Sequence, residues 1–479
     1  MKLASTILLL SKITSVSPFA FVNENKPNLT FEEKMKTLQD HPKLMEIIIE
    51  FANRNKINVD QAIGLLSAAA ATLKDKCTDV DVVIDYVESN PVVFIDEMVK
   101  QINITDNEQK ETYHYSIPAS NINCMTPHHV LGPSISEDDI RDKPTKYFEQ
   151  DENGYVYIKD TSNTRHCAGK FFIHSLDGLR NSSQNISRSD GKLIFVYGNE
   201  SLLDSCNCLN SKKFDLANVA SNHNGIETIS KDDFEKTFSQ YPNDHTQGPA
   251  IMMGFPFSSF VLLHLLNGKK VDGHTSPLKS CEMFQVMSSK KPDKGPSYEL
   301  NLLKGFGIST SAGYINYDSL KGKSFKNDKN FRVLTVEDAP LSLKKNDKLY
   351  EFQKNPHKMT LFIAAAIPNE GSYGSNASKS QVKKYLKMYY ESLFRYCKLK
   401  EIKNALITPI GIGVFGIPIE WHLEILNNMQ DLIKQSGSTY WINGYNANYD
   451  KYENKYKQIK FKNIDNLKSI DEMMLIANK

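Results

Sequence analysis

Residues 405–418 read Ala-Leu-Ile-Thr-Pro-Ile-Gly-Ile-Gly-Val-Phe-Gly-Ile-Pro. Apolar and β-branched residues dominate the first part, so residues 405–410 are predicted to form a short buried strand. Three glycines follow in the turn 411–416, and apolar residues then recur at helical spacing over residues 419–435. A strand, a glycine turn and a helix in this order are typical of a site where backbone N–H groups bind a phosphate.

Two interpretations of the glycine turn are open on the residues alone. Glycine permits φ > 0 and lets a phosphate approach the backbone, but a strand followed by glycines also forms tight turns that bind nothing. The spacing of Gly411, Gly413 and Gly416 matches the letters of the dinucleotide motif G-x-G-x-x-G. The context does not match, because the turn lies near the C-terminus and no acidic residue follows on a second strand about twenty positions later.

A second pair of polar segments lies upstream. Residues 214–227 begin like a strand and end in Asn222, Asn224 and Glu227, which are separated by turn-forming residues. Residues 243–250 read Asn-Asp-His-Thr-Gln-Gly-Pro-Ala, and an apolar segment follows them. This apolar segment is predicted to be a helix or a hairpin.

Taken together, these segments resemble a divergent macro-domain-like family that includes bacterial effector proteins of the MavL type. The glycine turn is similar to the macro-domain loop G-x-G-[VI]-[FY]-G. The upstream pair is similar to V-A-S-x-x-N-x-x-E followed by D-R-T-Q-G-P-A, with His245 in place of the arginine. Looser matches at 311–314, 333–338 and 361–368 occur in the family's order, and the resemblance covers roughly residues 190–435.

The resemblance implies a site for ADP-ribose, whose diphosphate the glycine loop wraps in macro domains. Cleavage of a ribosyl bond needs a carboxylate that stabilises an oxocarbenium-like centre and places a water. Asp244 is the first candidate, then Glu227 and finally Asp233; Asp244 also fits a helix N-cap. The expected ligand contacts are Asn222, Asn224, Thr246, Gln247, Gly248, Asp338, Gly411, Ile412, Gly413, Val414, Phe415 and Gly416.

Three of these contacts have simpler alternatives. Asp338 is expected at the end of a strand, where it can accept from the adenine amine, but an acid after a strand is also a common turn or cap residue. Asn222 and Asn224 can bind ribose hydroxyls, although asparagines next to glycine are ordinary turn residues.

Composition narrows the classes of partner. The chain has 479 residues, enough for two or three domains, with 40% hydrophobic and 24% charged residues, as in ordinary soluble globular proteins. A net charge of +2 provides no overall basic field, so no nucleic acid partner is expected, and the lysine-rich run 321–329 is read as a solvated loop. Seven cysteines without a C-x-x-C pair favour neither a disulfide framework nor a zinc ribbon. No metal and no cofactor besides the ADP-ribose ligand are expected.

Changes of pattern along the chain predict its organisation. The fold class is α/β, a macro-domain-like mixed sheet flanked by helices, preceded by a small all-α module. No segment is apolar over the length of a membrane span. The predicted segments are a flexible or weakly signal-like N-terminus (1–26), the helical module (27–110), a linker with strands that can form the edge of the next domain (111–190), the macro-like domain (191–440) and a C-terminal tail (441–479).

The predicted function is hydrolysis of an ADP-ribose linkage on a protein target. The resemblance further implies an effector that a bacterium secretes into a host cell to act on ubiquitin signalling; without such export the protein is expected in the cytoplasm. Two alternatives remain open. One is a reader that binds ADP-ribose without chemistry, and the other is an adaptor that recruits a host protein through residues 27–110.

Overall fold

The computed structural model divides the chain into two compact units. One unit comprises Met1–Cys124 and Lys348–Lys354, and the other comprises Met125–Asp347 and Asn355–Lys479. In the first unit, β1 (Ser116–Pro118) pairs antiparallel with the first residues of β12 (Leu349–Ala364). The segments expected at 1–26 and 27–110 lie outside the described residues. The structure describes residues 116–118, 140, 143–226, 247–266, 287–290, 298–345, 349–369, 375–413, 415–444 and 449–476.

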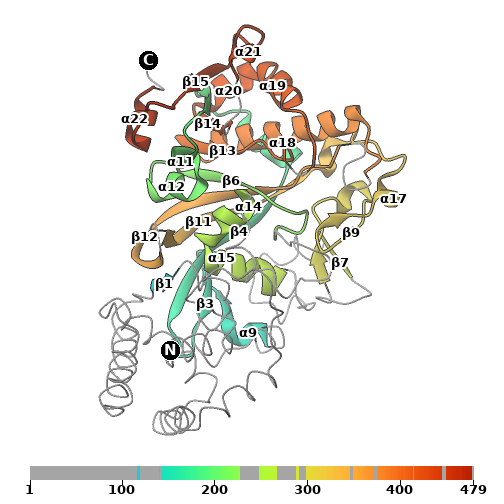
Figure 1. Ribbon diagram of the computed structural model, residues 1–479. Helices are drawn as coiled ribbons and strands as arrows, with labels where there is room; N and C mark the ends of the chain where they lie inside the picture. The colour runs from blue at the N-terminus through green and yellow to red at the C-terminus, as the bar shows by residue number, and fades with distance from the viewer. Residues whose placement is uncertain are drawn as a thin grey trace, which may run out of the picture. The chain divides into compact units, whose positions relative to one another are not determined.

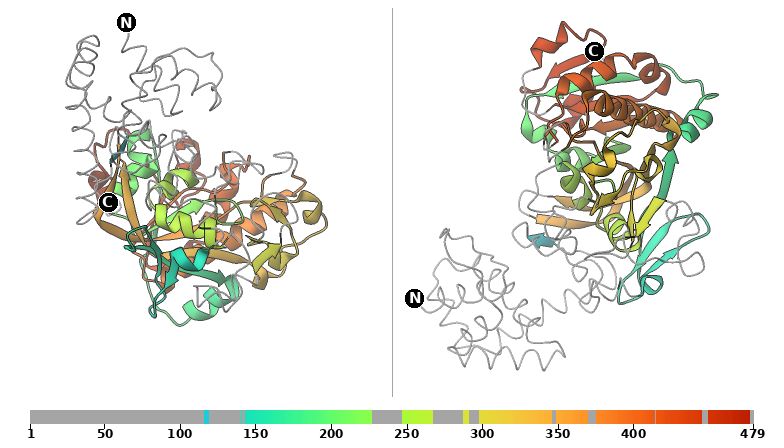
Figure 2. Two further views of the ribbon diagram at one scale, coloured as in Figure 1. Left: turned by 90° about the horizontal axis from the view of Figure 1, so that it is seen from below. Right: turned by 90° about the vertical axis from the view of Figure 1, so that its right-hand side faces the viewer.

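A large mixed sheet runs through the second unit (Figures 1 and 2), in the order β15-β5-β14-β13-β6-β12-β11-β4-β3-β2. The strands from β15 to β12 are parallel, whereas β4 pairs antiparallel with β11 and β3, and β2 pairs antiparallel with β3. The predicted mixed α/β architecture is therefore confirmed. The bounds are β2 (Phe148–Gln150), β3 (Val156–Lys159), β4 (Arg165–Ser175), β5 (Lys192–Tyr197), β6 (Leu216–Ala220), β11 (Arg332–Lys345), β13 (Asn404–Ile407), β14 (Thr439–Asn443) and β15 (Lys460–Asn463).

The parallel strands are buried on both faces. Side chains alternate between the faces of a strand, and in β6 the side chain of Leu216 joins the apolar cluster formed with helix α18 (Lys379–Leu399). By this alternation Ala217 and Val219 point to the opposite face, and all three residues are fully buried. Such two-sided burial is typical of parallel strands, and it explains their nearly continuous apolar sequences.

Helices cover both faces of the sheet. On one face α10, α19 and α20 contact α18, and on the other α14 contacts β6 while α15 contacts β4 and β11 (Figure 1). Two small antiparallel hairpins, β7–β8 and β9–β10, lie outside the sheet order. The remaining bounds are α9 (Pro144–Tyr147), α10 (Leu176–Ser183), α11 (Glu200–Leu203), α12 (Ser205–Asn210), α14 (Gln247–Met253), α15 (Pro256–Phe260), η4 (Val261–Leu266), β7 (Ser288–Lys290), β8 (Tyr298–Leu300), η5 (Lys304–Phe306), β9 (Thr310–Ser311), β10 (Tyr314–Ile315), α17 (Tyr317–Leu320), η6 (Asp328–Asn330), α19 (Ile419–Asn427), α20 (Gln430–Ser436), α21 (Asp450–Glu453) and α22 (Ile470–Leu475).

Apolar residues recur at helical spacing over residues 380–397, which predicts a helix, and α18 spans this segment. Its first turn is closed by a capping box, in which Ser378 and Gln381 exchange side-chain and backbone hydrogen bonds. The apolar stripe of α18 is fully buried against the sheet and the neighbouring helices. It includes Val382, Leu386 and Leu393.

The elements around the glycine turn are confirmed with different bounds. Strand β13 ends at Ile407, three residues before the predicted end. The helix predicted at 419–435 is two helices, α19 and α20. The break follows Asn428, whose N–H is shared between the carbonyls of Glu424 and Ile425, and asparagine is a poor helix former.

The segments predicted as linker and tail belong to the sheet. Strands β2, β3 and β4 lie within residues 111–190, the segment predicted as a linker with strands, and form the antiparallel edge of the sheet. The sheet continues beyond the predicted boundary at residue 440, because β14 begins at Thr439 and β15 pairs in parallel with β5. Pairing between strands more than two hundred and fifty residues apart (192–197 and 460–463) leaves no local signal in the sequence.

Among the helices of the described ranges, none taken singly is long and apolar enough to cross a membrane. One pair, Gln247–Met253 with Pro256–Leu266, passes on length and composition but is bent by 111° between its two parts.

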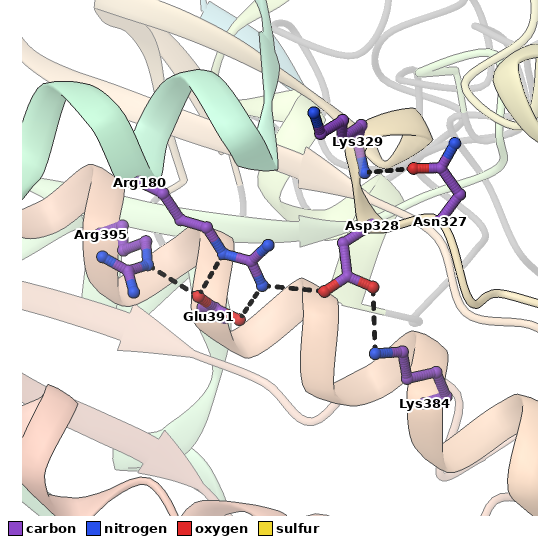
Figure 3. Close-up of polar contacts among 7 residues, drawn as sticks. All are labelled: Arg180, Asn327, Asp328, Lys329, Lys384, Glu391 and Arg395. Carbon is purple, nitrogen blue, oxygen red and sulfur yellow. Dashed lines mark hydrogen bonds and ion pairs between the residues drawn. The ribbon is translucent and has the colours of Figure 1, made fainter.

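An ion-pair network fixes α10 and η6 on α18 (Figure 3). The Arg180 guanidinium donates two hydrogen bonds of 2.7 Å to the Glu391 carboxylate and one of 2.9 Å to Asp328. Arg395 donates to Glu391 at 2.8 Å, and Lys384 lies 3.0 Å from Asp328. Burial opposes ionisation of Glu391, but the hydrogen bonds from Arg180 and Arg395 outweigh it and lower the pKa of this carboxyl.

We predict that Glu391→Gln lowers the free energy of unfolding by roughly 2 kcal/mol at pH 7, because two arginines lose their anionic partner. The lowered pKa of Glu391 means that its contribution is present above the ordinary carboxyl pKa and is lost as the pH falls through the folded value. Urea unfolding at pH 7 and pH 3 measures both effects, and the difference between variant and wild type should shrink at the lower pH. Asp318→Asn, in an exposed pair with Lys321, is the control and should change stability by less than about 0.5 kcal/mol. Equal losses in the two variants would contradict the prediction.

Candidate functional site

The loops that follow the neighbouring strands β6 and β13 run in opposite directions along the sheet. After β6 the chain re-enters the parallel part of the sheet as β12, on one side of β6, whereas after β13 it continues to β14 on the other side. Loops that leave two neighbouring strands in opposite directions open a space at the carboxyl ends of those strands, and open α/β sheets bind their ligands there. The loops that begin at Ser221 and Thr408 therefore flank the candidate site.

Asn218 joins the two strands where they separate. The backbones of β6 and β13 pair only at Leu216 and Ala217. Beyond this point the Asn218 Oδ1 accepts from the Thr408 N–H at 2.6 Å, and its Nδ2 donates to the Thr408 carbonyl at 3.0 Å and to the Tyr389 hydroxyl at 2.9 Å. The side chain is fully buried. Because its amide replaces the missing backbone partner, β13 stops at Ile407 without leaving buried polar groups unpaired.

Gln247 completes the same region from a distant part of the sequence. Its Oε1 accepts from the Ala220 N–H at 2.9 Å, and its Nε2 donates to the Asn218 carbonyl. We call the side chains of Asn218 and Gln247 the amide bridge. The bridge attaches the first residue of α14 to the carboxyl end of β6, beside the start of the glycine turn. Gln247 was expected to contact the ligand, but its side-chain oxygen and nitrogen both bind strand backbone, and Gly248 is buried in α14.

The glycines of the turn serve different purposes. Gly411 has φ +80, and a Cβ there would lie 2.7 Å from both Ala366 Cβ and Ile417 Cδ1, so this position needs glycine for the fold itself. Gly413 has no atom within 4 Å of the position that a Cβ would take. The turn closes on itself through a 3.0 Å hydrogen bond from the Ile417 N–H to the Gly411 carbonyl. Of Gly411 and Gly413, it is therefore Gly413 at which a side chain would enter open space.

The loop after β12 holds the far end of the glycine turn. The Asn369 N–H donates to the Phe415 carbonyl at 3.0 Å, and the Asn369 side chain donates to the Gly416 carbonyl at 3.2 Å. Phe415 is half-buried against the apolar core. The turn is therefore fixed at both ends, by Thr408 and by Asn369, and Ile412 and Gly413 lie between these attachments.

The loop after β6 carries the two expected asparagines, and we call its residues 222–226 the β6 loop. Asn222 and Asn224 are buried, and the Asn224 Oδ1 accepts from the Ile226 N–H at 2.9 Å, which shapes the loop. The turn 312–313 presses on both residues: a Cβ at Gly313 would lie 2.5 Å from Asn222 Cβ and 2.7 Å from Asn224 Oδ1. The turn at 312–313 therefore lies beside the loop after β6.

His223, between the two asparagines, is neutral at physiological pH. Burial lowers the pKa of its imidazole to about 3, and the nearby carbonyl of Ala366 offsets only part of this effect. The residue therefore contributes no positive charge to the carboxyl edge of β6. An anion bound there would receive no charge from His223.

Asp338 lies away from these loops. It was expected at the end of a strand, but β11 continues to Lys345, and Asp338 lies inside it with φ +54. Its Oδ2 accepts from the Tyr155 hydroxyl at 2.7 Å and lies 3.9 Å from the Lys170 Nζ of β4. The structure thus places Asp338 on the antiparallel part of the sheet and does not bring it together with the glycine turn.

The remaining expected residues, Glu227, Asp244, Thr246 and Val414, lie outside the described residues, as does Asp233. Within the described ranges, no group of three or more His, Cys, Asp or Glu residues is arranged to hold a metal ion.

The sequence analysis missed two residues of this region, Asn218 and Glu299. A signal existed for Asn218, because it is a polar residue inside the apolar strand Leu-Ala-Asn-Val-Ala. Glu299 had none, since a single acid that alternates with Tyr298 and Leu300 in a strand looks like a residue of the solvent face.

Comparisons with known proteins give distant likenesses. No family model matches the chain, and no curated protein matches it in sequence. Among solved structures, a poly(ADP-ribose) glycohydrolase from Deinococcus radiodurans in complex with ADP-ribose matches with a TM-score of 0.34 and 10% identity, over 59% of this chain and 90% of that chain. The corresponding enzyme from Thermomonospora curvata matches with a TM-score of 0.33 and 10% identity, over 64% and 89%.

We predict that Gln247→Met lowers the free energy of unfolding by roughly 2 kcal/mol, because a side chain of similar size leaves the Ala220 N–H and the Asn218 carbonyl buried without a partner. Gln430→Met is a matched control, since Gln430 donates one hydrogen bond to a helix carbonyl at a half-buried position. Its cost should stay below about 1 kcal/mol. Urea unfolding of the three proteins measures the difference. Equal stability of the Gln247 variant and wild type would show that the amide bridge does not hold α14 on β6.

Proposed function

We propose that the carboxyl edge between β6 and β13 binds ADP-ribose and that the protein hydrolyses an ADP-ribose linkage on a protein target. The observation that supports this proposal is the amide bridge, because it brings Gln247, the first residue of α14, and the start of the glycine turn to one place in the sheet. These two segments are the strongest points of the macro-domain resemblance. A glycine turn after a strand suits the diphosphate, and the polar β6 loop suits a ribose.

The proposed chemistry needs a carboxylate beside the distal ribose. Asp244 precedes Gln247, a residue of the amide bridge, by three positions in the sequence. Glu227 directly follows Ile226, whose N–H is bound by Asn224. We assign Asp244 the task of stabilising the oxocarbenium-like centre and orienting a water, with Glu227 as the second candidate.

Two parts of the proposal rest on the resemblance alone. They are export from a bacterium into a host cell and a target in host ubiquitin signalling. Comparing the release of ADP-ribose from modified ubiquitin with its release from other modified proteins tests the second part. Faster release from other proteins would exclude ubiquitin as the preferred target.

We predict that Gly413→Ala weakens ADP-ribose binding at least about tenfold, or 1.4 kcal/mol, while leaving the melting temperature unchanged. The added methyl enters the space that is open in the structure, where the proposal places the diphosphate. Calorimetric titration with ADP-ribose and thermal unfolding measure the two quantities. Gly411→Ala is the matched control and should lower the melting temperature, because its Cβ would clash with Ala366 and Ile417. Wild-type affinity in the Gly413 variant would place the diphosphate elsewhere.

We predict that Asp244→Asn slows the release of ADP-ribose from a modified protein at least about 100-fold and keeps both the fold and ADP-ribose binding. Asparagine caps a helix as well as aspartate does, so the variant separates a catalytic carboxylate from an N-cap. Loss of a general acid or base typically slows a reaction by about 10²–10⁴-fold. Single-turnover release assays measure the rate. Release at the wild-type rate would remove Asp244 from the mechanism, and binding without release in the wild-type protein would identify a reader.

A further inference from the structure

Glu299 is a buried carboxylate that none of the motifs includes. It lies in the short strand β8 and is 1% exposed. Its two oxygens accept from consecutive backbone N–H groups, Oε2 from Ala312 at 3.1 Å and Oε1 from Gly313. A carboxylate that accepts from backbone N–H groups forms charge-assisted hydrogen bonds, which are stronger than those between neutral groups. Glu299 therefore fixes the turn 312–313 from inside the molecule.

The turn that Glu299 holds is itself conformationally demanding. Ala312 has φ +51 and Gly313 has φ +78, so both residues adopt the left-handed region, which is unfavourable for alanine. Such a turn needs interactions that compensate for its backbone conformation. The two hydrogen bonds to Glu299 supply them, and they leave the Gly313 carbonyl directed toward the β6 loop, where it accepts from the His223 N–H at 3.2 Å.

The β6 loop is therefore held between two segments. On one side the Gly313 carbonyl binds the His223 N–H, and Gly313 packs against Asn222 without room for a Cβ. On the other side the Leu302 N–H, three residues after Glu299, donates to the His223 carbonyl at 3.0 Å. Both attachments depend on the segment 298–313, whose two ends are joined by the Glu299 carboxylate.

We propose that Glu299 is a positioning residue for the ligand site: through the turn 312–313 it sets the place of the β6 loop, residues 222–226, at the carboxyl edge. This inference rests on the proposed function, since the β6 loop is assigned there to the ribose end of ADP-ribose. Glu299 itself touches no ligand. Its effect on binding is carried by backbone atoms, so a neutral side chain of the same shape cannot replace it. A glutamine would set its NH₂ group against one of the two backbone N–H donors.

We predict that Glu299→Gln increases amide hydrogen exchange in residues 222–226 and 312–313 at least about tenfold, because loss of one charge-assisted hydrogen bond frees the turn. The same variant should bind ADP-ribose at least about tenfold more weakly. Gly313→Ala, which keeps Glu299 and displaces Asn222 instead, should weaken binding in the same way. Glu391→Gln is the control, because it also converts a buried carboxylate to an amide but lies in the network of α18. It should lower stability and leave both the exchange of 222–226 and the affinity unchanged.

The outcomes separate a positioning role from a merely structural one. Loss of affinity in Glu299→Gln and Gly313→Ala, with retention in Glu391→Gln, supports the proposal. Wild-type affinity in a destabilised Glu299→Gln variant overturns it, as does unchanged exchange in residues 222–226. If the wild-type protein binds no ADP-ribose, the proposed function fails and the ligand role of Glu299 fails with it. In that case the exchange data still show whether Glu299 holds the β6 loop.

Discussion

The candidate site depends on how two side-chain amides replace a missing piece of β-ladder. Where β6 and β13 separate, their backbone groups would be buried without partners, at a cost of about 1–3 kcal/mol each. The amide bridge supplies those partners: Asn218 binds both backbone groups of Thr408, and Gln247 binds the strand on either side of Val219. The same contacts therefore let β6 and β13 separate and keep the loops that follow them at the carboxyl ends of the two strands.

The loops of the site are held mainly by polar contacts and close backbone approach. Asn369 fixes the end of the glycine turn, and Glu299 fixes the turn that carries Gly313. Buried hydrogen bonds are directional, so they specify one arrangement of a loop more narrowly than apolar contacts do. The apolar residues of the parallel strands and of α18 provide the stable base beneath them.

The sequence predicted elements whose signals are local and missed features that depend on distant pairing. The strand before the glycine turn and the helical segment after it were found because their apolar patterns lie within each segment. The end of β13 at Ile407 and the place of β15 beside β5 could not be found, because they are set by residues far away in the chain. The same holds for the site: the order of the motifs predicted that Gln247 lies near the glycine turn, but its hydrogen bonds to the strand and the distant position of Asp338 appear only in three dimensions.

The most direct test of the account is amide hydrogen exchange of the wild-type protein titrated with ADP-ribose. A single site between β6 and β13 predicts that residues 218–226 and 408–416 gain protection together, with one midpoint, although nearly two hundred residues separate them in sequence. Protection of one segment alone, or of neither, would contradict the claim that the two loops form one nucleotide site.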